Sequence, residues 1–138
     1  SSEDIQSGQL TQDRQVFRMC GQSLRIDGKD GKRHLVTQFL PKLKPNTKYL
    51  LTFDIRMEQV RPSGAGPSGA VLNMGIPGNL WYPKNWYTGS MPWTSQGWEF
   101  TTSAETNRDP KRPAFLRLQL YNAFGTVWFD NLQLKEVK

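Results

Sequence analysis

A strict alternation of apolar and polar side chains through residues 48–58 constrains the fold of this chain more than any other feature. Successive side chains of a β-strand point to opposite faces of the sheet, so a period of two indicates one buried and one solvated face. The apolar positions are Tyr49, Leu51, Phe53, Ile55 and Met57. This segment is therefore predicted to be a half-buried strand.

A second alternation runs through residues 114–122. Its two faces carry, respectively, Leu116, Leu118 and Leu120, and Phe115, Arg117, Gln119 and Tyr121. The leucine face is predicted to join the core, and the opposite face is predicted to be open to solvent or to a ligand.

The C-terminal segment, residues 126–137, keeps its apolar side chains on one face only if one extra residue is accommodated at Asp130–Asn131. The apolar positions are Val127, Phe129, Leu132 and Leu134. A β-bulge inserts one such residue into a strand. We therefore predict a bulge at residues 130–131.

Weaker strand patterns lie between turn-forming dipeptides such as Asp27-Gly28 and Pro45-Asn46. They cover residues 15–19, 23–27, 35–40, 69–76 and 97–103. About eight short strands without alternating helices are typical of antiparallel sandwiches and barrels. The expected fold class is all-β.

Size and composition point to a single domain over residues 1–138, because the chain is long enough for one core and too short for two. Cys20 is its only cysteine, which excludes an internal disulfide and a cysteine-based zinc site. The chain contains no run of about 18 apolar residues, so no membrane span is predicted. The first residues lack a signal-peptide pattern, so any export signal is expected to have been removed or to lie upstream in a longer parent chain.

The formal net charge of +6 could attract a polyanion such as nucleic acid, an anionic membrane or an acidic glycan. The basic residues are scattered over turns rather than gathered into one tract. That distribution also fits an ordinary solvated surface.

Two segments interrupt the strand pattern. Residues 61–68 form a Pro/Gly loop that is predicted to be an exposed connection. Residues 77–96 are predicted to form a long aromatic loop, and four of the five tryptophans lie between Trp81 and Trp98. Loops of this length are usually functional or disordered, and the aromatic content argues against disorder.

The aromatic loop is the first half of a candidate sugar-binding site. A pyranose ring has an apolar face of C–H bonds, which a flat aromatic ring can contact. The candidate contacts are Trp81, Trp86 and Trp93, which would form a stacking platform, with Tyr82 and Tyr87. Tyr82 and Tyr87 could instead pin the loop to the sandwich, and Trp98 is expected to pack into the core.

Polar side chains on the outward faces of the predicted strands supply the second half. Planar amide and guanidinium groups make several hydrogen bonds to neighbouring hydroxyls, so this face is a candidate ligand contact. An ordinary polar face is the alternative. The residues expected to converge are Asp54, Arg56, Glu58, Asn73, Arg117, Gln119 and Tyr121.

Three short segments resemble carbohydrate-binding modules of the galactose-binding-like jelly-roll type, related to families 4, 9 and 22. These segments are residues 43–56 (LKPNTKYLLTFDIR), 97–102 (GWEFTT) and 125–134 (GTVWFDNLQL). The resemblance covers residues 23–137, whereas residues 1–22 are atypical and lack the usual opening strand.

The resemblance implies a two-sheet antiparallel β-sandwich, or jelly roll, that binds a ligand without catalysis. It also implies a structural role for Trp98. Asp130 matches a position that sometimes supports a structural calcium ion, and no other cofactor is expected.

Catalytic patterns are weak in this sequence. His34 is the only histidine and no Gly-x-Ser-x-Gly elbow accompanies it. Asp54 and Glu58 lie roughly 13 Å apart along one strand, which is too far for either glycosidase geometry. We expect a non-enzymatic domain.

The sequence therefore predicts a secreted or cell-surface domain that binds a polysaccharide or oligosaccharide and targets an appended glycoside hydrolase or polysaccharide lyase to it. No membrane insertion is expected. Two alternatives stay open. One is a single-stranded nucleic-acid-binding β domain, in which basic and aromatic residues are expected to be interleaved. The other is a structural or protein-docking β-sandwich of a multidomain surface protein.

Overall fold

The computed structural model describes residues 14–19, 23–76, 86–106 and 109–137 of the chain. This part contains eight β-strands: β1 (Arg14–Met19), β2 (Leu24–Gly28), β3 (His34–Phe39), β4 (Lys48–Pro62), β5 (Gly69–Gly75), β6 (Gly89–Thr101), β7 (Phe115–Tyr121) and β8 (Ala123–Glu136). Each of them overlaps a segment in which the sequence predicts a strand. Among the described residues, no helix has the length and apolar character needed to cross a membrane.

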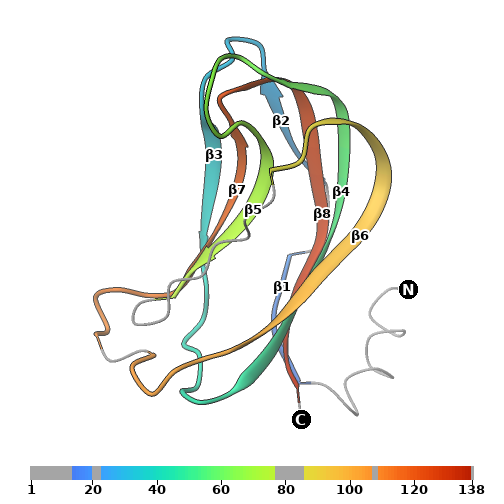
Figure 1. The fold of residues 1–138 in the computed structure, drawn as a ribbon. Helices are drawn as coiled ribbons and strands as arrows, with labels where there is room; N and C mark the ends of the chain where they lie inside the picture. Colours follow the sequence, from blue (N-terminus) through green and yellow to red (C-terminus); the bar gives the residue numbers. More distant parts are fainter. Residues whose placement is uncertain (1–13, 20–22, 77–85, 107–108, 138) are drawn as a thin grey trace.

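The strands form two antiparallel sheets that face each other (Figure 1). The larger sheet has the order β1-β8-β4-β6, with β2 also pairing with β8. β2 lies along residues 125–129 of β8 and β1 along residues 132–136. The smaller sheet has the order β3-β7-β5. The predicted all-β, two-sheet sandwich is confirmed.

The core between the sheets is built from the two alternating faces that the sequence predicts. Tyr49, Leu51, Phe53, Ile55 and Met57 of β4 are all buried. They are joined from β7 by Leu116, Leu118 and Leu120. Because alternate residues of β7 fill the core, the side chains between them must lie on the outer face of the smaller sheet.

The predicted bulge is present in β8. Thr52 of β4 pairs with Gln133 and Asp54 pairs with Asp130, so β8 has one residue more than β4 over this interval. Asn131 has a left-handed backbone with a φ of 51°, a conformation that asparagine tolerates better than most residues. The bulge lets Phe129 and Leu132 both be buried.

The prediction of one long loop over residues 77–96 is wrong in its second half, because residues 89–96 belong to β6. β6 pairs with the 15-residue strand β4 as far as Val60 opposite Gly89. The register shifts between Ile55 and Met57 and between Met57 and Val60, which hides the period of two. β6 lies at the edge of the larger sheet, where a proline such as Pro92 is tolerated in a strand.

Candidate functional site

The outer face of the smaller sheet gathers side chains from all three of its strands. Gln119 of β7 pairs with Leu35 of β3 and Val71 of β5. Arg117 pairs in the same way with Thr37 and Asn73. Residues that lie directly opposite in antiparallel strands share a face, so these two rows run side by side across the sheet.

A hollow with a volume of about 300 Å³ opens on this face. Its lining residues are Arg33, Pro67, Asn73, Trp86, Arg117, Gln119 and Tyr121. The lining therefore combines two guanidinium groups, two carboxamides and two aromatic rings that can donate a hydrogen bond at their edge.

The amides of the hollow are held by a chain of hydrogen bonds. Nε of Arg33 donates to Oε1 of Gln119 at 3.2 Å, and Nε2 of Gln119 donates to Oδ1 of Asn73 at 2.7 Å. Gln119 and Asn73 are only 3% and 7% exposed. Because each amide is oriented by a hydrogen-bond partner, the polar wall of the hollow has a defined geometry.

Arg117 is positioned by an aromatic ring beneath it. Its guanidinium carbon lies 4.6 Å from the centre of the Phe115 ring. The ring in turn covers Gly75, where an added Cβ would come within 2.3 Å of Cζ of Phe115. Gly75 thus makes room for Phe115, and Phe115 supports the arginine from below.

The aromatic wall of the hollow consists of Trp86 and Tyr121, whose ring centres lie 5.0 Å apart with an interplanar angle of 39°. Trp86 is carried next to β5 by Tyr87, whose backbone N–H and C=O both bond to Ala70 at 2.9 Å. Arg33 closes the other side, with its guanidinium carbon 5.4 Å from the centre of the Tyr121 ring.

Five residues predicted for the site do come together in this hollow: Asn73, Trp86, Arg117, Gln119 and Tyr121. Tyr87 lies beside it and fastens the segment to β5, the anchoring role that was the alternative for this residue. Trp81 and Tyr82 lie outside the described residues.

Trp93 is not part of the platform with Trp86. It belongs to β6 in the larger sheet and is 45% exposed. The segment around Trp93 pairs with β4 through two register shifts. These shifts break the alternation of apolar and polar residues, so the sequence pattern did not indicate a strand there.

The predicted convergence of Arg56 on this site is wrong, and so is that of Asp54 and Glu58. All three lie on β4, which belongs to the larger sheet, whereas β7 belongs to the smaller one. The guanidinium carbon of Arg56 instead lies 4.6 Å from the ring centre of Trp128, and its guanidinium forms an ion pair with Oε1 of Glu58 at 3.1 Å. The outward faces of the two sheets point away from each other, so these side chains cannot meet those of Arg117 and Gln119.

Arg33 was missed by sequence reasoning. It lies one residue before β3, and continuing the pairing of His34 with Leu120 brings it opposite Tyr121. Arg33 is also separated by two and four residues from Leu35 and Thr37, which lie on the outer face of β3. The period of two along β3 could therefore have placed Arg33 on the same face.

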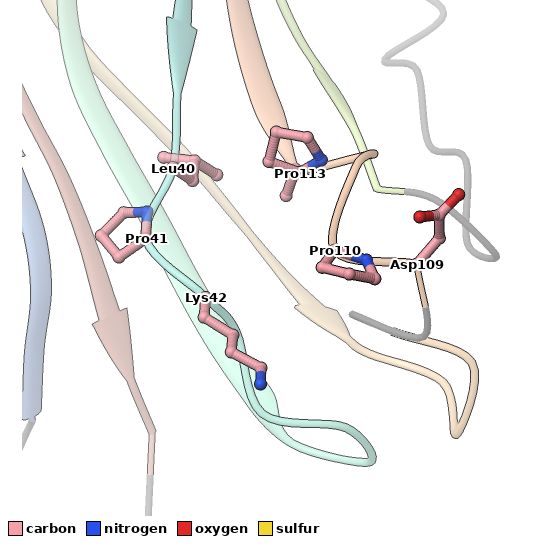
Figure 2. Close-up of a pocket in the computed structure, with 7 residues that line it drawn as sticks. Leu40, Pro41, Lys42, Asp109, Pro110 and Pro113 are labelled. Carbon is pink, nitrogen blue, oxygen red and sulfur yellow. The ribbon is translucent and has the colours of Figure 1, made fainter.

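A smaller pocket of about 170 Å³ lies where the chain leaves β3 and approaches β7 (Figure 2). It is lined by Leu40, Pro41, Lys42, Asp109, Pro110, Pro113 and Ala114. Proline has no backbone N–H, and besides Lys42 and Asp109 none of the lining residues has a polar side chain. We do not regard it as the functional site.

Trp98 and His34, which the sequence analysis also considered, lie outside the hollow and contact other parts of the domain. Trp98 packs against the core with its ring edge-on to Phe53, at a centre-to-centre distance of 5.8 Å. Nε2 of His34 lies 2.6 Å from Oδ1 of Asp30 on the surface, and this hydrogen bond lowers the pKa of Asp30.

The surroundings of Asp130 do not fit a calcium site. The backbone N–H of Asn131 donates to Oδ1 of Asp130 at 2.7 Å, and the Ser23 hydroxyl donates to Oδ2 at 3.4 Å. Calcium needs about six to eight oxygen ligands. In the described ranges no three Asp, Glu, His or Cys side chains gather as a metal-binding group.

No protein-family model matches this chain, and no curated protein matches it either. Among solved structures, a CBM4 structure is 12% identical, with a TM-score of 0.52 over 90% of this chain and 77% of that one. The CBM22-1 xylan-binding domain of Xyn10C from Paenibacillus barcinonensis is 10% identical, with a TM-score of 0.42 over 87% of this chain and 97% of that one. A Stig cyclase, Fisc, from Fischerella sp. TAU is 23% identical, with a TM-score of 0.48 over 72% of this chain.

The chain spans 54% of the length of that cyclase. The similarity to the CBM4 structure is one of fold, and it agrees at that level with the resemblance of residues 43–56, 97–102 and 125–134.

Proposed function

We propose that this domain binds a polysaccharide or oligosaccharide, without catalysis, in the hollow on the outer face of β3, β7 and β5. The observation that carries the proposal is the meeting of Trp86 with the oriented amides of Gln119 and Asn73 in one hollow. The CBM4-like fold supports the same function.

The physical argument rests on the two-sided chemistry of a sugar ring. An aromatic side chain removes the apolar C–H face of the ring from water, while amides and guanidinium groups replace the water molecules around its hydroxyls. Trp86 and Tyr121 supply the first kind of contact. Gln119 and Arg33, already fixed by hydrogen bonds, supply the second at little entropic cost.

The affinity should be modest, on the order of micromolar to millimolar, because a ligand rich in hydroxyls loses many hydrogen bonds to water on binding. A domain with such affinity is useful when it is tethered, since it raises the local concentration of its partner on the substrate. The proposed context is therefore a longer secreted or cell-surface parent chain that carries a polysaccharide-degrading enzyme.

Affinity electrophoresis through gels that contain single polysaccharides tests this function, with Trp86→Ala as the main variant. We expect the wild-type protein to be retarded by at least one glycan and Trp86→Ala to lose about tenfold or more in affinity, the effect of removing an aromatic anchor. Trp93→Ala is the matched control, because it removes an exposed tryptophan from the other sheet.

A different result would replace this function. If no glycan retarded the protein while single-stranded DNA bound it with a steep dependence on salt concentration, the domain would be a nucleic-acid-binding module. Retention that survived Trp86→Ala but not Trp93→Ala would move the site to the larger sheet.

A further inference from the structure

The charge of the hollow is one-sided. Arg33 and Arg117 line it, and no aspartate or glutamate among the described residues does so. Across the described ranges, neither of these arginines forms an ion pair, whereas Arg25 and Arg56 on the larger sheet pair with Asp27 and Glu58. The hollow therefore presents positive charge without a built-in counter-charge.

Arg117 also has an unsatisfied donor. Its Nε is buried, and none of the described residues accepts a hydrogen bond from it. A buried cationic N–H without an acceptor is costly to a folded protein. Because this nitrogen has no exposed surface, a ligand would reach the guanidinium of Arg117 only on the side that lines the hollow.

The nearest acidic side chain in sequence to Arg33 is that of Asp30, and it is engaged elsewhere. Its Oδ1 accepts from the backbone N–H of Lys32 at 3.0 Å and lies 2.6 Å from Nε2 of His34. Arg33 itself is directed at Gln119 and at the Tyr121 ring. Asp30 therefore does not neutralise the hollow.

We propose that the hollow recognises an acidic sugar, and that the carboxylate of a uronic acid residue is held by Arg117, with Arg33 adding positive charge to the same hollow. This inference rests on the proposed glycan-binding function and specifies its ligand class. The planar guanidinium of Arg117, which lines the hollow, matches a carboxylate in a two-point hydrogen bond. The aromatic wall then contacts the ring that bears the carboxylate.

The test compares polyuronates with the same polymers after chemical reduction of their carboxyl groups. Polygalacturonate, alginate and glucuronoxylan, each with its reduced form, serve as probes in affinity electrophoresis and calorimetry. We expect at least one polyuronate to bind wild-type protein about tenfold or more tightly than its reduced form, as for a charged group whose partner is removed.

The decisive variant is Arg117→Gln, which should lose that preference and bind both forms of the polymer equally. Arg61→Gln is the matched control, because Arg61 also lies over an aromatic ring, 5.1 Å from the centre of Phe124, and its loss changes the net charge by the same amount. Arg117→Lys keeps the charge but loses the planar guanidinium, so its preference should fall between those of the wild type and Arg117→Gln. Thermal unfolding of each variant shows whether it is folded.

The failure of this inference differs from the failure of the proposed function. Equal binding of the reduced and unreduced polymers by wild-type protein would overturn the acidic-sugar inference and leave glycan binding intact. No binding to any glycan would overturn both. A preference that Arg61→Gln abolished as fully as Arg117→Gln would show non-specific charge attraction, and would also overturn the inference.

Discussion

At the scale of single residues, the side chains of the hollow are held in place by neighbouring side chains, some of which lie outside it. Phe115 lies below Arg117, and its ring occupies the space left free by the missing side chain of Gly75. Asn73 orients Gln119 from the adjacent strand. The candidate site is therefore built on β7, the central strand of the smaller sheet, with support from β5 on one side, which favours a fixed geometry.

Trp98 should prove to be a stability residue rather than a binding residue. It packs against the core and contacts Phe53 edge-on. Trp98→Ala should lower the free energy of unfolding by about 3 kcal/mol, the lower end of the range for large aromatic side chains, because the indole is only partly buried. Urea denaturation measures the change, and affinity for a glycan ligand at a temperature where the variant is folded should stay within about twofold. Intact stability with lost binding would contradict this assignment.

At the scale of elements, the bulge in β8 decides which side chains face the core. Without the extra residue at Asn131, the apolar residues on one side of the bulge would face the core and those on the other side would face solvent. Val127 and Phe129 lie before it and Leu132 and Leu134 after it, and all four are buried. A local backbone feature thus maintains one continuous core along a 14-residue strand.

Asn131→Val should destabilise the domain by about 1–2 kcal/mol more than Asn131→Gly. Both variants lose the hydrogen bond that Gln133 donates to Oδ1 of Asn131 at 2.8 Å. Only valine must also hold a branched side chain at the left-handed backbone of position 131, where φ is 51°. Parallel denaturant unfolding of the two variants gives the difference. Equal stabilities would mean that the strand relaxes the bulge when the residue is changed.

At the scale of the whole molecule, two sheets divide the surface into two outward faces with different chemistry. The face of the smaller sheet carries the hollow, whose two arginines form no ion pair with any described residue. The face of the larger sheet carries Trp128 between Arg25 and Arg56, and both arginines have carboxylate partners. The ligand specificity of the domain should therefore lie on the first face.

Chelation of divalent cations should leave the stability of the domain unchanged. Asp130, the residue that suggested a calcium site, accepts hydrogen bonds from Asn131 and Ser23. Thermal unfolding with and without EDTA should give midpoints within about 3 °C of each other, equivalent to less than about 1 kcal/mol for a domain of this size. A much larger fall on chelation would reveal a bound ion that stabilises the folded state.

The strands, their buried faces and the bulge were predictable from the sequence because they are local properties of the chain. The alternation at Tyr49–Met57 and the leucines of β7 report which side of a strand avoids water, whatever that strand pairs with. The outward position of Arg117, Gln119 and Tyr121 follows from the same parity.

The choice of strand partners was decided only by the tertiary structure. Pairing of β7 with β5 rather than with β4 brings Asn73 to Gln119 and excludes Arg56. The pairing of β6 with β4 also makes residues 89–96 part of a strand and takes Trp93 away from Trp86. These outcomes depend on backbone hydrogen bonds between segments far apart in the chain, and such bonds carry no signature in the local order of side chains.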